Sequence, residues 1–206
     1  MNKGRCPFCD RLELRSRVVA ERGIFLVLSD AHPIVPGHAL IVPRGHLTSM
    51  ASLGVRQRAE LQKLVALVSM RLRRNGANVV AFERGNFSRN RSRDVSVDHA
   101  HVHLIPLPSD VSPSPEFADG VSSRPSTWQR RLSRRSYWHL SGRGSPSLTG
   151  DAEGLPSQAI RTVSGAAVGR TDWDWRAQHR GIPTAMLRRA NELLLRRLMG
   201  TSNRRS

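Results

Sequence analysis

The 206-residue chain has few aromatic residues, no long apolar run and only two cysteines. Aromatic side chains make up 5% of the residues, so the core has to be built mainly from aliphatic side chains. A transmembrane helix needs about 20 consecutive apolar residues. The sequence has no such stretch, and we expect no membrane partner. The first residues also lack an apolar signal core, which leads us to expect a cytoplasmic protein.

Negative charge is also scarce. The chain has 33 Lys and Arg residues against 16 Asp and Glu, which gives a formal net charge of +17. Only Lys3 and Lys63 are lysines, so nearly all of the positive charge is carried by arginine. Such a surplus favours polyanionic partners, among them nucleotides, nucleic acids and anionic membranes, but it does not choose between them.

The two cysteines lie close together, as Cys6 and Cys9 in the sequence Cys-Pro-Phe-Cys. In a reducing compartment, a Cys-x-x-Cys pair is a redox centre or half of a metal site. The Trp-Cys-Gly-Pro-Cys context of a thioredoxin-like centre does not occur here. Taken alone, the pair does not decide between the two uses.

Three histidines recur at alternate positions, His99, His101 and His103, with apolar residues between them. Alternate side chains of a β-strand point to the same face, so the pattern predicts a strand with a row of imidazoles on one side. Pro106 is expected to end this strand, because proline cannot donate to a ladder. Such a row can coordinate a metal, or one ring can attack an electrophile while its neighbours hold the substrate. The alternative is a solvated strand face.

Strands and helices are both predicted around this row. Short β-rich runs predict strands at residues 18–21, 24–29, 38–42, 77–83 and 137–140, the first two forming a hairpin. Apolar stripes at helical spacing predict helices at residues 55–74 and 184–199, and residues 155–168 could form a helix with Ser157 near its start.

A second motif precedes the histidine row. Residues 30–46 read Asp-Ala-His-Pro-Ile-Val-Pro-Gly-His-Ala-Leu-Ile-Val-Pro-Arg-Gly-His. Together with His-x-His-x-His, this block resembles the histidine-triad (HIT) superfamily of nucleotide hydrolases and transferases. The uridylyltransferase-like branch of that superfamily has Gln at the third triad position, whereas the hydrolase-like branch has His. His103 therefore indicates a resemblance to the hydrolase-like branch.

The resemblance implies roles for particular residues. His101 would attack the α-phosphorus and form a covalent nucleotidyl-histidine, while His103 would contact phosphate oxygens. Ser96 would hydrogen-bond the phosphate or the leaving oxygen. Asp30 would bind the ribose hydroxyls, and Phe8 lies where relatives pack the base. The alternatives are an Asp30 that only caps a turn and a Phe8 that belongs to the core.

The sequence departs from the family pattern just before Ser96. Relatives often carry Gly-Gln there, but this chain has Asp94 and Val95. The amide that would contact the leaving group is missing, which leaves the identity of the leaving group open. Nearby guanidinium groups could compensate, since they match phosphate geometry; they belong to Arg89, Arg91 and Arg93.

The resemblance also implies a metal site. Cys6, Cys9, His46 and His99 match the positions at which some members of the family hold a structural zinc ion. Two thiolates and two imidazoles suit tetrahedral zinc. The alternative is a pair of reduced thiols and a surface His46.

Arginines are concentrated at the end of the chain, on and after the last predicted helix; they are Arg188, Arg189, Arg196, Arg197, Arg204 and Arg205. Two interpretations are open. The helix could be docked on the catalytic domain with solvated arginines, or it could be a polyanion-binding arm with weak affinity for nucleic acid.

We therefore predict an α+β fold with an antiparallel histidine-triad sheet, one main helix and a basic C-terminal extension containing helices. The catalytic histidine-triad domain is expected over residues 4–110. A Ser/Pro/Gly/Arg-rich linker or partly ordered segment is expected over 111–154, and a helical extension over 155–206.

The expected function is hydrolysis at the α-phosphate of a nucleotide, with a dinucleoside polyphosphate or a nucleoside phosphoramidate as substrate. Three alternatives stay open: a nucleotidyltransferase or phosphorylase of the same family, a nucleic-acid-binding protein with an inactive triad, and a hydrolytic site with zinc on three histidines. We expect a structural zinc ion and no organic cofactor. The sequence leaves homodimerisation open.

Overall fold

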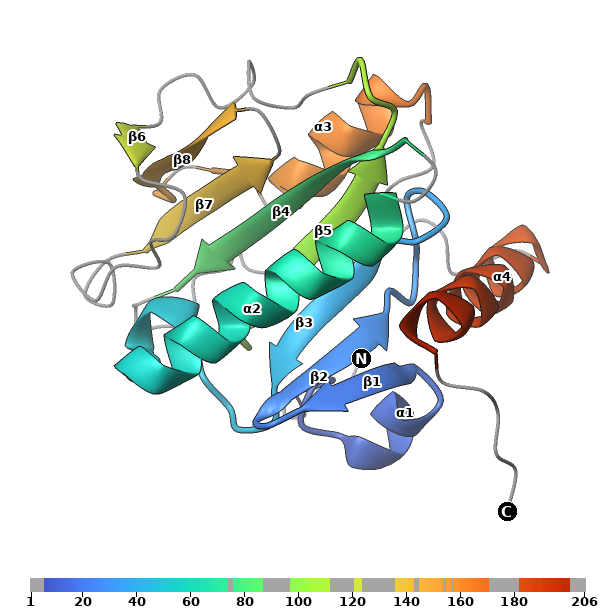
Figure 1. The fold of residues 1–206 in the computed structure, drawn as a ribbon, viewed down its shortest axis with the longest axis horizontal. Coiled ribbons are helices and arrows are strands. Elements are labelled where there is room, and N and C mark those ends of the chain that lie inside the picture. Colours follow the sequence, from blue (N-terminus) through green and yellow to red (C-terminus); the bar gives the residue numbers. More distant parts are fainter. Residues whose placement is uncertain are drawn as a thin grey trace.

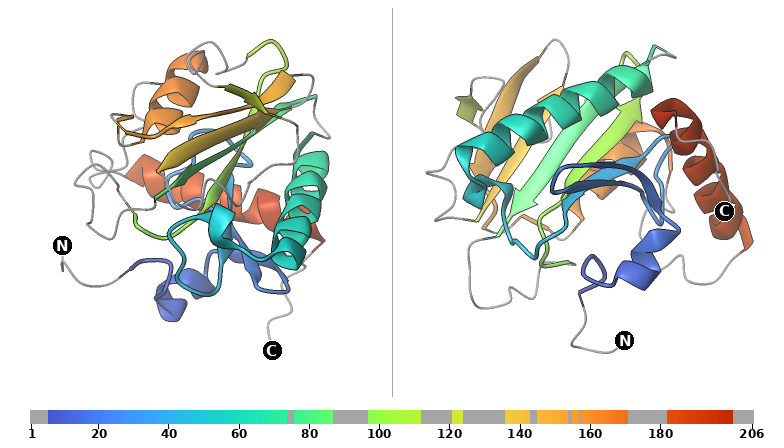
Figure 2. Two further views of the ribbon diagram at one scale, coloured as in Figure 1. Left: turned by 90° about the vertical axis from the view of Figure 1, so that its left-hand side faces the viewer. Right: turned by 60° about the horizontal axis from the view of Figure 1, so that its bottom comes forward.

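The computed structural model describes residues 6–73, 76–86, 97–111, 121–123, 136–142, 145–153, 155–156, 158–170 and 182–200. Within them the chain forms one eight-stranded sheet with helices on both faces (Figures 1 and 2). The elements in chain order are α1 (Arg11–Arg15), β1 (Val18–Arg22), β2 (Phe25–Ser29), β3 (Ala39–Pro43), the 3-10 turn η1 (Met50–Ser52), α2 (Val55–Leu72), β4 (Asn78–Gly85), β5 (Val102–Leu107), β6 (Val121–Ser123), β7 (Tyr137–Gly142), β8 (Ser145–Asp151), α3 (Ala159–Ala167) and α4 (Ile182–Met199). The α+β prediction is confirmed.

Every strand pair in this sheet is antiparallel, and the strand order is β1-β2-β3-β5-β4-β7-β8-β6. The predicted hairpin is β1 with β2, and Gly23 turns it with a φ of +51° that a glycine adopts without strain. Gly37 makes a second sharp turn before β3, with a φ of +93°. A Cβ there would also lie 3.0 Å from the Pro106 side chain and 3.1 Å from the Leu72 side chain, closer than ordinary contact, so both the backbone conformation and the space favour glycine.

The main core lies between the sheet and α2, which crosses one face of the sheet (Figure 1). The predicted stripe on α2 is correct, since Leu61, Leu64, Val68 and Leu72 are all buried in this cluster. The opposite face carries α3 over a second apolar cluster (Figure 2, left). No helix in the described ranges has the length and apolar character needed to cross a membrane.

The prediction for the histidine strand is wrong at both ends. β5 begins at Val102, so only His103 of the three histidines lies within it, and it continues to Leu107, past Pro106. Proline is tolerated at position 106 because β3 pairs with β5 only from Val102 to Leu104. Beyond Leu104 one side of β5 has no partner in β3, and a proline is accepted at such an edge.

The sheet continues beyond β4 into the segment expected to be a linker. β7 pairs with β4 over Tyr137 to Ser141, and β8 pairs with both β7 and β6. Tyr137 is fully buried, and its hydroxyl donates to Glu83 of β4 at 2.7 Å. The expected division into residues 4–110, 111–154 and 155–206 stays a prediction.

The last helix, α4, is docked on the rest of the chain. It packs against β1, β2 and α2, and Leu195 and Met199 are buried in the main core. Asn191, 1% exposed, accepts the N–H of Gly37 at 2.6 Å and donates to the carbonyl of His38 and the hydroxyl of Ser29, both at 2.9 Å. The helix therefore stabilises the turn that leads into β3.

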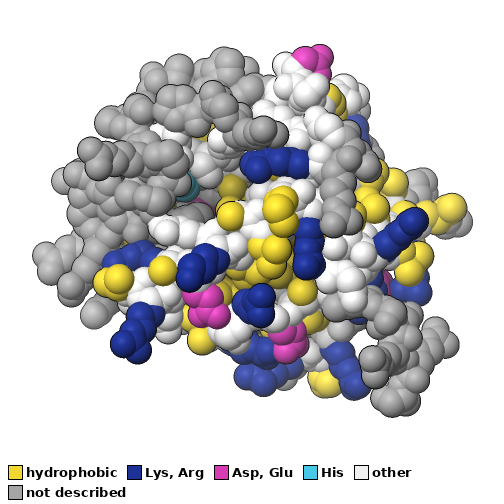
Figure 3. Space-filling view, viewed as in Figure 1, with side chains coloured by type: hydrophobic (Ala, Val, Ile, Leu, Met, Phe, Trp, Pro, Cys, Tyr) yellow, Lys and Arg dark blue, Asp and Glu magenta, His cyan; other side chains and the backbone are white. Residues whose placement is uncertain are grey.

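Several α4 arginines have partners within the chain. Arg188 donates to the carbonyl of Ala31, and Arg189 and Arg196 both pair with Glu192. Basic side chains are spread over the visible face and mixed with acidic ones (Figure 3). The hydrogen bond of Arg188 and the ion pairs of Arg189 and Arg196 suit a docked helix. Nucleic-acid binding through α4 stays a prediction. Arg204 and Arg205 lie outside the described residues, as do Arg89, Arg91, Arg93, Asp94 and Val95.

Candidate active site

A pocket opens on the side of the sheet away from α2. Four of the five residues expected to bind or attack a nucleotide line it: Phe8, Asp30, His101 and His103. The fifth, Ser96, lies outside the described residues. The Phe8 ring meets the His101 ring edge to face at 5.3 Å between centroids, and Phe8 is also part of a small apolar cluster. Both interpretations of Phe8 therefore fit, because it lines the pocket and belongs to a core.

His101 immediately precedes β5, and its ring is held by the backbone. Its Nδ1 lies 2.8 Å from the carbonyl oxygen of His99. A carbonyl only accepts hydrogen bonds, so Nδ1 carries the proton and Nε2 carries the lone pair. Burial lowers the pKa of His101 below its ordinary value of 6.5, although the carbonyl acts in the opposite direction. The ring therefore has an unprotonated Nε2, which is what a nucleophile requires.

His38 and His103 form a chain of hydrogen bonds. The N–H of Ile34 donates to His38 Nδ1 at 3.3 Å, so His38 carries its proton on Nε2. That nitrogen lies 3.0 Å from His103 Nδ1 and donates to it. His103 must then carry its own proton on Nε2, leaving an N–H donor on a ring that lines the pocket. Burial lowers the pKa of His38 to about 4 and that of His103 well below 6.5, so both are neutral near pH 7.

Asp30 directly follows β2, at the start of the turn that leads to β3. Its Oδ1 accepts the N–H of His32 at 2.7 Å, as in the turn-capping alternative. The carboxylate also lies 3.3 Å from Arg161 and 3.7 Å from His38. Asp30 is thus a turn cap and a pocket residue at once.

The C-terminal part of the chain forms one wall of the pocket, through the start of α3. This wall comprises Leu155, Pro156, Gln158, Ala159, Ile160 and Arg161. The helix begins later than predicted, because Gln158 has a left-handed backbone with a φ of +66°. Arg84 of β4 fixes the segment before it by donating to the carbonyls of Ala152 and Leu155.

Sequence reasoning missed His38 and Arg161, whose side chains contact predicted residues of this site. His38 had a signal, since it lies in the Pro-Gly-His part of the block that resembles the family. Arg161 had none, because it is 131 residues from Asp30 and follows an irregular segment.

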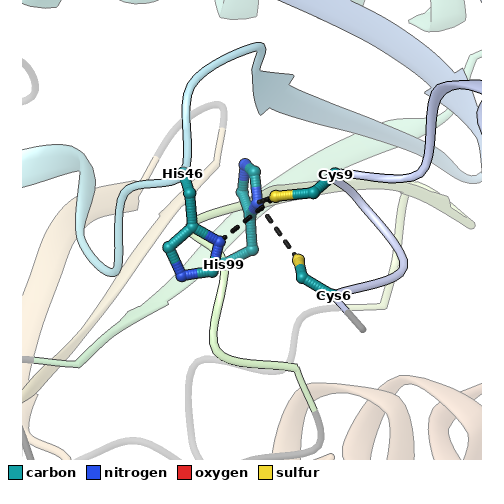
Figure 4. A group of neighbouring side chains, drawn as sticks. All are labelled: Cys6, Cys9, His46 and His99. Carbon is teal, nitrogen blue, oxygen red and sulfur yellow. Dashed lines mark hydrogen bonds between the residues drawn. The ribbon is translucent and has the colours of Figure 1, made fainter. Parts of the chain in front are cut away.

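The predicted metal ligands do converge (Figure 4). The ligand atoms of Cys6, Cys9, His46 and His99 all lie within 4.8 Å of one another. His99 Nδ1 is 3.4 Å from the Cys6 sulfur, and His46 Nδ1 is 3.4 Å from the Cys9 sulfur. A turn closed by the Cys9 N–H and the Cys6 carbonyl brings the two thiols together. The cluster could hold a metal ion.

The surroundings of His99 suit a ligand. Its Nε2 lies 3.0 Å from the carbonyl of Pro43, which orients the ring and leaves Nδ1 for the thiol side. Burial lowers the pKa of His99 to about 4 and raises that of the Cys6 thiol. A bound cation would displace the thiol proton, since metal binding favours the thiolate.

A second group of potential ligands comprises Asp30, His38 and His103. The Arg161 guanidinium, 3.3 Å from Asp30, disfavours a divalent cation there. The three triad histidines do not form such a group in the described part of the chain. His99 instead faces the thiols and His103 faces His38, which argues against zinc on all three histidines.

Several known proteins are similar to this chain. A sequence model of the HIT domain matches residues 11–109. Over 107 residues the chain is 29% identical to an adenosine 5'-monophosphoramidase of Schizosaccharomyces pombe. The matched segment covers 51% of this chain and 76% of that protein. Among solved structures, one similar chain is a hypothetical histidine triad nucleotide-binding protein of Sulfolobus tokodaii, with 19% sequence identity and a TM-score of 0.43. The match covers 94% of this chain and 93% of that protein's chain. A second is a hypothetical protein of Leishmania major, with 23% sequence identity and a TM-score of 0.42. That match covers 56% of this chain and 89% of the Leishmania chain.

Proposed function

We propose that this chain, whose residues 11–109 match a sequence model of the HIT domain, is a nucleotide hydrolase acting at an α-phosphate through a covalent nucleotidyl-His101 intermediate. The observation that carries this proposal is the hydrogen bond between His101 Nδ1 and the His99 carbonyl, which leaves an unprotonated Nε2 on a ring lining the pocket. The relative named as an adenosine 5'-monophosphoramidase supports a nucleoside phosphoramidate as the substrate class. A dinucleoside polyphosphate is the second class.

In the first step, the lone pair of His101 Nε2 attacks the α-phosphorus. A nitrogen–phosphorus bond forms, and the bond from phosphorus to the leaving group breaks with its electron pair. The leaving amine or phosphate takes up a proton from the solvent. In the second step, a water oxygen forms a bond to the same phosphorus and loses its proton to the solvent. The nitrogen–phosphorus bond breaks, its electron pair returns to Nε2, and the mononucleotide is released.

The structure supports this chemistry at two points. The His101 ring becomes cationic in the intermediate, and its Nδ1–H bond to the His99 carbonyl then becomes a stronger, charge-assisted bond. The Nε2–H of His103, assigned through His38, is available to donate to the phosphate oxygens as their charge increases. Asp30 would take a ribose hydroxyl, and Phe8 would contact the base.

Whether water or another acceptor attacks the intermediate separates hydrolase from transferase. Both begin with the same His101 adduct, so the alternative of a nucleotidyltransferase or phosphorylase shares the first step. Ser96 is proposed to assist the leaving group, and the arginines of the same segment could take the place of the missing amide.

We propose zinc for the cluster of Cys6, Cys9, His46 and His99. The donor set of two thiols and two imidazoles is typical of structural zinc. These residues would hold the ion and tie the N-terminal turn to the His46 loop and to the residue two positions before His101. Bound there, zinc would supply structural cross-linking with no open coordination position for chemistry.

The experiment is a trapping assay. The protein is incubated with a panel of labelled adenosine 5'-phosphoramidate, dinucleoside polyphosphates and nucleoside triphosphates, quenched in alkali, and digested for mass spectrometry. We expect an adenylyl mass on the peptide that carries His101. Turnover without any adduct under rapid quench, or an adduct on another residue, would contradict the mechanism.

A further inference from the structure

Arg161 brings a buried charge into the pocket from the C-terminal part of the chain. It lies in the first turn of α3, is only 5% exposed, and places Nη1 3.3 Å from both carboxylate oxygens of Asp30. Its Nη2 donates to the carbonyl oxygen of His32. One guanidinium therefore fixes the carboxylate and the backbone that follows it.

Asp30 needs this partner, because a buried carboxylate stays ionised only beside a compensating charge. His38 lies 3.7 Å from Oδ2, but it is neutral near pH 7 because burial lowers its pKa to about 4. Arg161 is a permanent cation in direct contact, whereas Arg17 acts on Asp30 more weakly and makes no direct contact with it in the described residues. Burial alone would raise the pKa of Asp30, yet its charged neighbours hold it well below the ordinary range.

The hydrogen bonds of Asp30 also determine what it can still accept. A carboxylate has about four lone-pair positions. Oδ1 accepts from the His32 N–H and from Arg161, while Oδ2 accepts from Arg161. An acceptor position therefore remains on Oδ2, in a residue that lines the pocket.

We propose that Arg161 is a positioning residue for ribose recognition, holding the Asp30 carboxylate so that Oδ2 accepts a hydrogen bond from a ribose hydroxyl. The C-terminal extension thereby gives the HIT domain its preference for ribonucleotides over deoxyribonucleotides. This inference rests on the proposed function, since it requires a nucleotide in the pocket.

Arg170 provides a matched control in the same extension. Its Nη1 donates to the carbonyls of Pro33 and Ile34, at 3.0 and 2.6 Å, so it holds the same loop as Arg161. It is not among the partners of Asp30 within the described residues, and it is not a residue of the pocket wall. Comparing the two arginines separates positioning of the carboxylate from general bracing of the loop.

The experiment measures the affinity of the full chain for AMP, 2'-deoxy-AMP and 3'-deoxy-AMP by calorimetry. The wild type should bind AMP on the order of 10- to 100-fold more tightly than one of the two deoxy analogues. That analogue lacks the hydroxyl that donates a hydrogen bond to the charged Asp30 carboxylate. Arg161→Met should bring that ratio near one, Arg161→Lys should leave an intermediate ratio, and Arg170→Met should keep the wild-type ratio.

A double variant tests whether Arg161 acts through Asp30. Asp30→Asn should abolish the ribose preference by itself, and adding Arg161→Met should change the ratio no further. The double variant should also melt at a higher temperature than Arg161→Met alone, which leaves a carboxylate buried without the cation that contacts it. If Arg161→Met does not fold, Arg161→Lys and the double variant carry the test.

Four results would overturn the inference. One is an unchanged ribose preference in folded Arg161→Met or Arg161→Lys, and another is an equal loss of preference in Arg170→Met. The third is a wild type that binds all three nucleotides equally, which overturns this inference and leaves the proposed function intact. A wild type that binds none of them overturns both.

Discussion

Two histidine clusters adjoin one another around the start of β5, and they differ in where their ring nitrogens point. In the metal cluster, the Nδ1 atoms of His46 and His99 turn toward the sulfurs of Cys6 and Cys9 (Figure 4). In the pocket cluster, the nitrogens of His38 and His103 pair as donor and acceptor. Converging lone pairs suit a cation, whereas a donor–acceptor chain fixes protons in place.

The partner of the second nitrogen decides the use of each ring. His99 and His101 are two residues apart, and each bonds a backbone carbonyl through one nitrogen. His99 uses Nε2 for this bond and presents Nδ1, while His101 uses Nδ1 and presents Nε2. The opposite choice of nitrogen directs one ring to the thiols and the other to the pocket.

The largest expected effect breaks the pocket cluster alone. His101→Ala should lower turnover by at least about 10³-fold, because no other ring replaces the attacking nitrogen. Metal content should stay at the wild-type level, since His101 is not a proposed ligand. Steady-state turnover of a phosphoramidate and metal analysis check both halves, and turnover within tenfold of the wild type would sink the assignment.

The reverse experiment breaks the metal cluster. Cys9→Ser should lower the free energy of unfolding by about 4 kcal/mol or more, because the cross-link between the N-terminal turn and β5 is lost with the metal. Urea denaturation and metal analysis of purified protein measure this. Adding Cys6→Ser should cost little more, since one lost ligand already empties the site. If wild-type protein stripped of metal has the same free energy of unfolding as the untreated protein, the zinc proposal is contradicted.

A smaller effect tests the hydrogen-bond chain. His38→Asn keeps an acceptor for the Ile34 N–H but removes the donor to His103. The rate of adduct formation in a single turnover should fall about 10²-fold, because the proton of His103 is no longer held on Nε2. Metal content serves as the control. A rate equal to the wild type would show that His103 needs no orienting partner.

The smallest effect comes from a buried histidine outside both clusters. Burial lowers the pKa of His139 in β7 from 6.5 to about 4, and Glu83 lies opposite it with its carboxylate accepting from Met50 and Tyr137. Unfolding then takes up a proton, so the stability that His139 contributes is complete above pH 6.5 and decreases as the pH falls toward 4. The slope is at most about 1.4 kcal/mol per pH unit.

The matched variant for this prediction is His139→Gln, which keeps a polar partner for Thr149 but does not titrate. Urea denaturation at pH 7.5 and at pH 5.0 should show a smaller loss of stability in the variant than in the wild type. Equal losses in the two proteins would contradict the lowered pKa of His139.

Much of the fold follows from local spacing. The β1–β2 hairpin and the buried stripe of α2 were predictable because side-chain period and turn residues are properties of a few neighbouring positions. The ends of β5 were not, because the tolerance for Pro106 depends on how far the neighbouring strand β3 extends. Likewise the late start of α3 depends on the backbone of Gln158 rather than on the apolar pattern.

The sequence by itself determined the residue types of both clusters. Three short motifs predicted the chemistry: the alternate histidines, the Cys-x-x-Cys pair and the block that begins at Asp30. Each can be recognised in the sequence because its members are close together in the chain. Only the tertiary structure decided which nitrogen each histidine presents, since the carbonyls and rings that fix them come from other strands. It also brought Arg161 to Asp30 across 131 residues, a contact made by packing of α3 on the sheet, for which no local pattern exists.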